Sequence, residues 1–522
     1  MMDRREMFKL GAGAVVSSAV LRADSAKPAV SQESGRVEQW GVFATRAKGR
    51  SSGNPFVDVS FGTRFTHSHR TVEVAGFYDG DGDYEVRFSP DMVGRWSFET
   101  FSSEKELSGL TGSFECTPPV SGNHGPVGTA HRFHFQYADG TPYFPFGTTC
   151  YSYGFIGDPL GKLTLEELHR AGFNKVRMCL LPKPLSKRKP AAMPFEHVGA
   201  TLTGTENLQD DSKSREKFDL TRLNPAYFRQ VEQSVHNLQS AGIEADLILF
   251  HPYDAWGFKS MEEEADDRYL RYAVARFSAF RNIWWSVANE YDLIPSKTMK
   301  DWDRFFRIIA ENDPYRRLRS IHHSKVVYDH SRPWCTHASL QEYDFQRSAE
   351  RLAAWNKPII YDEIQYEGNI ASRWGNLAPE EMTRRFWQAI VNGVYATHGE
   401  TYQSKDGNPV WSDAGKLHGS SAPRLAFLRK LLEECGTTGL FAADAPYYPY
   451  AANPDERYLY YFDFHCVGEY EFPLPENGRF KVTLIDPWAM TKTPLAGTFS
   501  GKSRIELTGK PYMAVLIEKI KG

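Results

Sequence analysis

The chain has 522 residues, which is too long for one ordinary domain and predicts two to four. Hydrophobic residues make up 41% of it, enough to form substantial cores, and this excludes an intrinsically disordered protein. The 62 Lys and Arg residues against 65 Asp and Glu give a formal net charge of −3, so charge provides no reason to expect nucleic acid or a membrane surface as a partner.

Residues 1–30 have the pattern of an export signal. A charged start containing Arg4-Arg5 precedes the mildly apolar stretch Leu10–Leu21, and small residues follow. The arginine pair resembles a twin-arginine signal, although Asp3 stands where Ser or Thr is usual. We therefore expect an exported, periplasmic protein; an uncleaved N-terminal helix is the alternative.

Residues 37–120 alternate between apolar and polar side chains with a period of two, as in Tyr84–Phe88 and Trp96–Thr100. Short strands separated by Gly, Asp and Pro turns predict an antiparallel β-sandwich. The segment Asp79–Asp83 resembles the start of a calcium loop, but its sixth position is Tyr84, where such a loop needs Gly. A hairpin turn is the better interpretation.

Residues 131–436 alternate between apolar strands and helices of period 3.6. One helix is predicted to begin at Asn224-Pro225 and to end at Gly242. Eight strands are expected: Tyr143–Cys150, Asn174–Pro182, Glu244–Pro252, Ile283–Glu290, Leu318–Ser324, Cys335–Gln341, Pro358–Tyr366 and Tyr395–Tyr402. This repetition predicts an α/β fold, a (β/α)₈ TIM barrel. A doubly wound sheet is the rival, but no glycine-rich phosphate-binding motif follows any strand.

Residues 437–522 return to short alternating strands and predict a second, C-terminal antiparallel β-sandwich. The long charged segment Lys183–Lys217 follows the second barrel strand, which places it on the catalytic rim. It is either a loop that shapes the substrate cleft or a plain insertion. The predicted order is thus signal peptide, N-terminal sandwich, barrel and C-terminal sandwich.

Polar side chains at the ends of the barrel strands are the candidate site, because a (β/α)₈ barrel carries its active site at the carboxyl ends of its strands. The candidates for substrate binding are Arg177, His251, Asp254, Asn289, His323, His337, Asp362, Glu400 and Tyr402. Three tryptophans that follow strands, Trp256, Trp374 and Trp411, are candidate stacking platforms for sugar rings, although ordinary packing is the better interpretation of each.

Two glutamates are the candidate catalytic pair. The apolar run Trp284–Ala288 ends in Asn289-Glu290, and a second apolar run, Pro358–Tyr361, ends in Asp362-Glu363. Strands four and seven lie nearly opposite across a barrel mouth, so the two carboxyl groups would face each other. Glycoside cleavage requires such a pair. One carboxyl group is protonated and donates its proton to the leaving oxygen, and the other either attacks the anomeric carbon or activates a water molecule. Membership in two separate ion pairs is the alternative.

These residues resemble the retaining glycoside hydrolases of clan A. The resemblance implies that Glu290 is the acid/base, Glu363 the nucleophile and Asn289 the ligand of the sugar 2-hydroxyl. It also implies that Arg177 supports the nucleophile, that His251 is the third-strand histidine and that His337 occupies the sixth-strand position. The clan's eighth-strand Trp is absent, since Glu400-Thr401-Tyr402 stands there.

The segments Gly140–Thr149, Phe250–Asp254 and Arg281–Asp292 resemble more closely the bacterial apiosidase-like barrel family, whose flanking modules resemble the two sandwiches. Apiose specificity is not implied, because the apiosidase pattern uses an Asp acid/base where this chain has Glu290.

The sequence thus predicts an exported retaining glycosidase acting on a plant or microbial glycan. Its partner would be an oligosaccharide or glycoside, with no nucleic acid, membrane, metal or cofactor involved, and a homo-oligomer is possible. A lyase or transglycosylase on the same scaffold stays open, and so do two alternatives of other kinds. One is a non-catalytic carbohydrate-binding protein on a degenerate barrel. The other is a metal-dependent barrel hydrolase that uses His251, His322, His323 and His337, although the first strand lacks the HxH that such a site needs.

Overall fold

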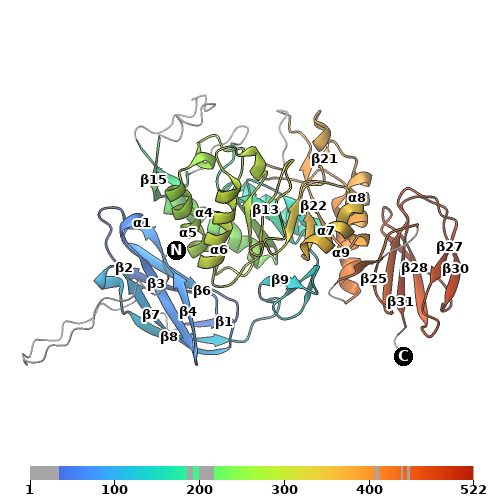
Figure 1. Cartoon of the computed structure of the whole chain (residues 1–522), viewed down its shortest axis with the longest axis horizontal. Helices are drawn as coiled ribbons and strands as arrows, with labels where there is room; N and C mark the ends of the chain where they lie inside the picture. The colour runs from blue at the N-terminus through green and yellow to red at the C-terminus, as the bar shows by residue number, and fades with distance from the viewer. Residues whose placement is uncertain are drawn as a thin grey trace, which may run out of the picture.

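The computed structural model describes residues 35–184, 192–198, 217–405, 411–436, 439–443 and 447–520. The expected signal peptide, residues 1–30, lies outside them. Three bodies follow one another in a row: an N-terminal β-module, a central barrel and a C-terminal β-module (Figure 1). The predicted TIM barrel flanked by two β-sandwiches is confirmed.

The N-terminal module consists of two packed sheets. The larger has the order β1 (Arg36–Glu38), β8 (Thr111–Thr117), β7 (Gly94–Ser102), β3 (Phe61–His67) and β4 (Arg70–Ala75), and the smaller β2 (Phe43–Lys48), β6 (Asp83–Phe88) and β5 (Phe77–Gly80). Inward-facing aromatic rings fill the space between the sheets, with Phe65 of β3 stacked on Phe88 of β6 at 4.2 Å between ring centroids. Every second residue of β2 is buried, as the period-two pattern predicts.

The Asp79–Asp83 segment is a hairpin turn, as expected, and it also braces the barrel. Asp81 and Gly82, with φ of 52° and 79°, form the turn between β5 and β6. The Asp79 carboxylate accepts a hydrogen bond of 2.7 Å from Arg276 on helix α5 (Glu263–Phe277), and it pairs with Arg229 on α4 (Pro225–Ser240) at 3.0 Å. These ion pairs fix the module against two barrel helices.

The barrel contains all eight predicted strands, each buried throughout or nearly so. They are β12 (Gly147–Thr149), β13 (Lys175–Cys179), β16 (Glu244–Phe250), β17 (Ile283–Ala288), β18 (Arg319–Ser320), β19 (Ala338–Leu340), β20 (Ile359–Tyr361) and β22 (Tyr395–His398). They pair in parallel in the order β18-β17-β16-β13-β12-β22-β20-β19. A backbone hydrogen bond of 2.9 Å from Thr336 to Arg319 joins the two edges and completes the ring.

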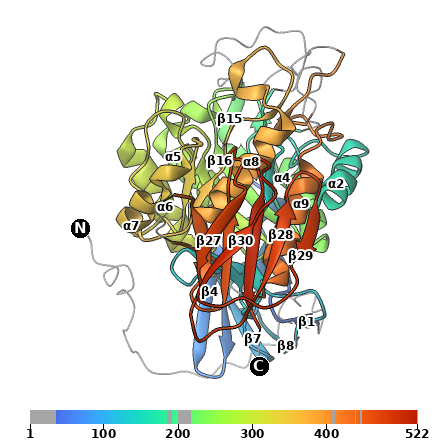
Figure 2. The same cartoon turned by 90° about the vertical axis from the view of Figure 1, so that its right-hand side faces the viewer.

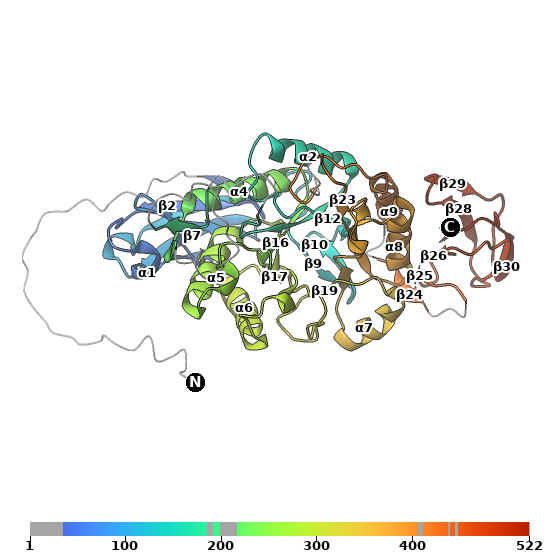
Figure 3. The same cartoon turned by 90° about the horizontal axis from the view of Figure 1, so that it is seen from above.

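Helices surround the strands on the outside (Figure 3). Besides α4 and α5 they are α2 (Leu160–Ala171), α6 (Met299–Asn312), α7 (Ser348–Trp355), α8 (Pro379–Val391) and α9 (Ala422–Glu434). Helix α4 begins where predicted, because the Asn224 side chain accepts the Ala226 N–H and Pro225 occupies the first turn. It ends just before Gly242, whose φ of 70° suits only glycine well.

The rim and the C-terminal module complete the fold. The predicted loop Lys183–Lys217 contains β14 (Phe195–His197), which pairs in antiparallel with β15 (Phe218–Leu223) directly after the loop. Residues 185–191 and 199–216 lie outside the described ranges. A second pair of short strands on the rim joins β21 (Glu367–Gly368) to β23 (Glu400–Thr401).

The C-terminal module consists of two sheets. The larger has the order β24 (Phe441–Ala443), β25 (Tyr450–Asn453), β26 (Arg457–Tyr461), β31 (Ala514–Lys519), β28 (Phe480–Asp486) and β29 (Thr491–Pro494). The smaller pairs β27 (Glu469–Pro473) with β30 (Lys502–Glu506).

The C-terminal module rests on helix α8, as Figure 2 shows from its side of the molecule. Arg384 of α8 binds both carboxylate oxygens of Asp463, and Trp387 of α8 stacks on Tyr461 with ring centroids 5.5 Å apart. Within the described ranges, none of the helices combines the length and the apolar character that crossing a bilayer would require.

A small antiparallel sheet closes the lower end of the barrel, at the amino ends of its strands. It comprises β9 (Val127–Ala130), β10 (His134–Tyr137) and β11 (Pro142–Tyr143), so the predicted first strand, Tyr143–Cys150, is in fact split between β11 and β12. Phe135 of β10 packs within 5.7 Å of His337 and 5.3 Å of Trp284. His337 precedes β19 and is fully buried in this floor, so the structure does not bring it to the cleft where it was expected to bind substrate.

Replacing His337 with Leu is expected to reduce the acid sensitivity of the fold. Burial lowers the pKa of His337 from 6.5 to about 3, and its Nε2 has no hydrogen-bond partner. Because the unfolded chain takes up this proton below pH 6.5 and the folded chain does not, stability is lost as the pH falls from 6.5 towards 3. The variant should retain about 3 kcal/mol more of its unfolding free energy between pH 7 and pH 4, measured by urea unfolding. A large loss of activity at pH 7 in a folded His337→Leu protein would instead place His337 in the reaction.

Candidate active site

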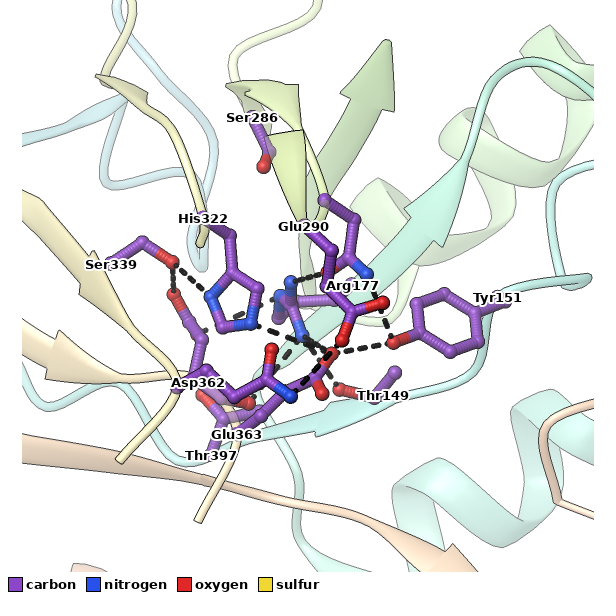
Figure 4. A network of polar contacts seen from close by, with 12 residues as sticks. Thr149, Tyr151, Arg177, Ser286, Glu290, His322, Ser339, Asp362, Glu363 and Thr397 are labelled. Carbon is purple, nitrogen blue, oxygen red and sulfur yellow. Dashed lines mark hydrogen bonds and ion pairs between the residues drawn. The ribbon is translucent and has the colours of Figure 1, made fainter. Parts of the chain in front are cut away.

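A cleft of about 590 Å³ opens at the carboxyl ends of the barrel strands. Glu290 follows β17 and Glu363 follows β20, and both line this cleft, so the structure brings the two predicted catalytic residues together. Figure 4 shows their carboxyl groups among the side chains that hold them. Both are largely buried, with 8% of each residue exposed.

Glu363 lies against a cation and a hydroxyl donor. Its Oε1 accepts a hydrogen bond of 2.5 Å from Tyr151 Oη, directly after β12, and one of 3.0 Å from Arg177 Nη1 on β13. His322 Nε2 lies 3.6 Å from the same oxygen. Burial and the charge of Arg177 lower the pKa of His322 well below 6.5, so the imidazole is neutral at physiological pH. Two donors and one neutral ring therefore fix the orientation of Glu363.

Glu290 has a different environment, with hydrogen bonds but no ion pair among the described residues. Its carboxyl group accepts from Tyr253 Oη and, at 3.1 Å, from Gln341 Nε2. Burial, and next to it the negative charge of Glu363, raises the pKa of Glu290 above its usual value. Its backbone adopts the left-handed conformation with φ of 45°, which costs energy in a non-glycine residue and is common at functional sites.

Asn289 and Arg177 connect the two glutamates. Arg177 Nη2 donates to Asn289 Oδ1 at 2.5 Å while its Nη1 binds Glu363. The Asn289 amide donates to Tyr253 Oη at 3.2 Å and, more weakly, to Tyr151 Oη at 3.5 Å. The two tyrosines, each bound to one glutamate, thus share one donor. One continuous network sets the relative position of the two carboxyl groups.

Asp362 lies below the cleft, inside the barrel, rather than facing substrate as expected. Its carboxylate accepts from Lys175 Nζ at 2.8 Å, Ser339 Oγ at 2.6 Å and Thr397 Oγ1 at 2.7 Å (Figure 4 includes the two hydroxyl residues). The positive charges of Lys175 and Arg177 hold the pKa of Asp362 well below its usual range despite burial. The residue therefore supports Arg177 from beneath, as an anion in the interior.

Three further predicted residues hold the backbone of rim loops. His251 Nε2 donates to the Leu181 carbonyl at 3.0 Å. Asp254 accepts the N–H groups of Trp256 at 2.7 Å and Lys259 at 2.9 Å. Glu400 accepts the N–H groups of His418 and Gly419 at 2.7 and 2.8 Å. These contacts shape the cleft's surroundings, and none of the three side chains lines the cleft.

The last two predicted residues contact acidic partners. Tyr402 Oη donates to Glu367 at 3.3 Å, away from the cleft. His323 Nε2 lies 3.7 Å from Glu342, a carboxylate that does line the cleft. His323 thus supports a lining residue rather than forming the wall itself.

Several cleft residues were given no role from the sequence. Tyr151 and Tyr253 were visible only as polar residues at strand ends, and Gln341 and Lys183 carried no signal. Of the three tryptophans, Trp374 lines the cleft and is 49% exposed, as a stacking platform requires. Trp256 and Trp411 are buried. Within the described ranges, no cluster of three or more His, Cys, Asp and Glu side chains is arranged to hold a metal ion.

The family model for the apiosidase-like catalytic domain matches residues 129–436, more than half of the chain. The chain belongs to this apiosidase-like family. Its barrel is therefore the catalytic domain of a glycosidase family, and the resemblance stated from the sequence is confirmed. Two domains of unknown function match the flanking modules of this apiosidase-like protein, DUF5060 at residues 36–103 and DUF5605 at residues 447–518.

Solved structures agree with this assignment. A putative glycoside hydrolase from Bacteroides vulgatus is 37% identical, with a TM-score of 0.85 over 93% of this chain and 100% of its own. A family 5 glycoside hydrolase from the same species shares the fold at 12% identity, with a TM-score of 0.57 over 77% of this chain and 95% of its own. No curated protein shows significant similarity to the chain.

Proposed function

We propose that this apiosidase-like protein is an exported, retaining glycoside hydrolase that cleaves an O-glycosidic bond of a plant or microbial glycan by double displacement. The observation that carries the proposal is the contrast between the two glutamates in one cleft. Glu363 is paired with Arg177, whereas Glu290 has no cationic partner among the described residues and has a raised pKa. One carboxyl group is thus prepared to act as an anion and the other as an acid.

In the first step, Glu363 attacks the anomeric carbon and forms a covalent glycosyl ester while the bond to the leaving oxygen breaks. Glu290 gives its proton to that oxygen. In the second step, Glu290 takes a proton from water, the water oxygen attacks the anomeric carbon, and the ester bond to Glu363 breaks. Each glutamate returns to its starting state, and water is the one reactant consumed besides the glycoside.

The surrounding contacts support these roles. The hydroxyl of Tyr151 and the guanidinium of Arg177 hold the attacking carboxylate in place, which reduces the entropy cost of reaching the anomeric carbon. Under this proposal Asn289, which Arg177 holds beside Glu290, is the residue that would bind a sugar hydroxyl. Trp374 offers an aromatic face to a sugar ring at the exposed edge of the cleft. The export part of the proposal depends on residues 1–30 and their Arg4-Arg5 pair.

Retention of anomeric configuration tests the mechanism. Aryl glycosides, including furanosides, and oligosaccharides would be hydrolysed while the anomeric protons are followed by NMR. We expect the first product to keep the configuration of the substrate, because two displacements invert the centre twice. Inversion would exclude Glu363 as the nucleophile. Binding of an oligosaccharide without any hydrolysis would favour the carbohydrate-binding alternative.

A further inference from the structure

Lys183 places a positive charge in the wall of the cleft. It follows β13 and lines the cleft together with Glu290 and Glu363. Its Nζ lies 4.7 Å from the ring centroid of Tyr151 and 4.8 Å from that of Tyr253. These are the two rings whose hydroxyls bind the catalytic pair, so the ammonium group lies beside the reaction centre and is held on two faces.

None of the described acidic residues that line the cleft pairs with this charge. Glu363 is paired with Arg177 at 3.0 Å. Glu342 is bound through both oxygens by Arg351, at 2.6 and 2.8 Å. The raised pKa of Glu290 keeps that carboxyl group protonated beyond the usual range of a glutamic acid.

Lys183 itself has no ion pair with any described Asp or Glu, and it is only half-buried. Among the described residues, the ammonium group of Lys183 therefore has no ion-pair partner in the cleft. Cation–π contact with two tyrosines offsets only part of the cost of partly desolvating an ammonium group. The N–H donors of Lys183, which bind no carboxylate among the described residues, are suited to an anionic ligand.

We propose that Lys183 selects a sugar with an anionic substituent, either the carboxylate of a uronic acid or a sulfate ester, in the cleft between Tyr151 and Tyr253. This inference rests on the proposed glycosidase function and names its substrate class. A bound carboxylate or sulfate would give the Lys183 ammonium group the ion-pair partner that no described residue supplies. A neutral sugar would shield the ammonium group from water without giving it a hydrogen-bond partner. The difference in binding free energy between the anionic and the neutral sugar is the source of the selectivity.

Matched substrate pairs test the proposal. Wild type and Lys183→Met would be compared on aryl glycosides that differ only by a carboxylate, such as hexosides against hexuronides, and on oligosaccharides with and without sulfate. Methionine keeps the length and the apolar stem but removes the charge. We expect kcat/KM for the anionic substrate to fall about 10- to 100-fold in Lys183→Met, because a hydrogen bond between charged groups is lost. For the neutral substrate, kcat/KM should fall less than about 3-fold.

Lys300→Met on the exposed surface of α6 is the matched control, and it should leave both members unchanged. A Lys183→Arg variant keeps the charge and should retain most of the preference for the anionic member. An equal fall for neutral and anionic substrates in Lys183→Met would overturn the proposal, because it would show that Lys183 only positions the two tyrosines. A wild-type preference for neutral sugars would overturn it as well.

The failure of this inference is distinguishable from failure of the proposed function. If no glycoside is hydrolysed, the proposed glycosidase mechanism fails, and the role of Lys183 is tested by measuring how tightly the protein binds acidic and neutral oligosaccharides. Calorimetric titration would compare oligogalacturonides, sulfated galactan oligosaccharides and neutral galactan oligosaccharides at 50 and 500 mM NaCl. Binding of an acidic member that weakens with salt and is lost in Lys183→Met supports the proposal, and the two acidic series tell carboxylate from sulfate. Equal binding of neutral and acidic members refutes it.

Discussion

Replacing Glu363 with Gln is expected to lower kcat/KM by about 10⁴-fold or more, the scale seen when a covalent nucleophile is removed. The amide is nearly the same size and can still accept from Tyr151 and Arg177, so the cleft should keep its shape. It cannot attack the anomeric carbon as a carboxylate does, and it carries no charge to stabilise the oxocarbenium-like transition state. Initial rates on the best aryl glycoside of the panel measure the effect.

Glu342→Gln provides the matched control. Glu342 is a carboxylate of the same cleft, paired with Arg351, but no described contact joins it to Glu290 or Glu363. Its loss should cost less than about tenfold in kcat/KM. Unchanged thermal unfolding of both variants would exclude a folding defect as the cause. Equal activity of Glu363→Gln and wild type would remove Glu363 from the mechanism, and similar losses in both variants would show a general sensitivity of the cleft.

The fold was accessible from the sequence because buried parallel strands are nearly continuous apolar runs. Such runs locate a strand well but not its ends. The predicted strand Leu318–Ser324 contains only the two-residue β18, and Cys335–Gln341 contains the three-residue β19. His337 and Gln341 show the consequence. Both belong to the same predicted strand, but only Gln341 is at its carboxyl end, and it binds Glu290.

The direction in which a side chain points was a second feature that the sequence could not predict. Asp362 and Glu363 are neighbours in sequence, but one turns into the barrel towards Lys175 and the other into the cleft. The residue pattern alone does not show which of the two adjacent carboxylates faces the cleft, and only the family resemblance selected Glu363 as the nucleophile.

Side-chain contacts between neighbouring strand ends were a third feature that the sequence could not predict. Lys183 contacts Tyr151 and Tyr253, which follow the strands on either side of β13. The predicted barrel places these strands next to each other, but the pattern does not show which side chains meet above them. Residues that match the pattern of the resembled clan, such as Glu290 and Arg177, could be named in advance, and cleft residues outside that pattern, such as Lys183, could not.

Glu290 should also set the alkaline side of the pH profile of the wild-type enzyme. Its pKa is raised by burial and by the charge of Glu363. It therefore keeps its proton to higher pH than an ordinary glutamic acid, and activity should fall as the pH rises through this raised pKa. In Glu363→Gln the neighbouring negative charge is gone, so the pKa of Glu290 should move down. Titration of the labelled carboxyl carbon by NMR in that variant measures the direction.

Replacing Glu290 with Ala is expected to slow hydrolysis by about 10²- to 10⁴-fold, with a size that depends on the leaving group. A substrate whose aryl alcohol leaves without protonation bypasses the first role of Glu290, so formation of the glycosyl ester on Glu363 should be nearly normal and its hydrolysis should become limiting. Azide, which needs no general base, should then restore turnover and give a glycosyl azide of retained configuration. Absence of rescue together with an equal loss for good and poor leaving groups would contradict the acid/base role, since Glu290 would then act by shaping the cleft through Tyr253 and Gln341.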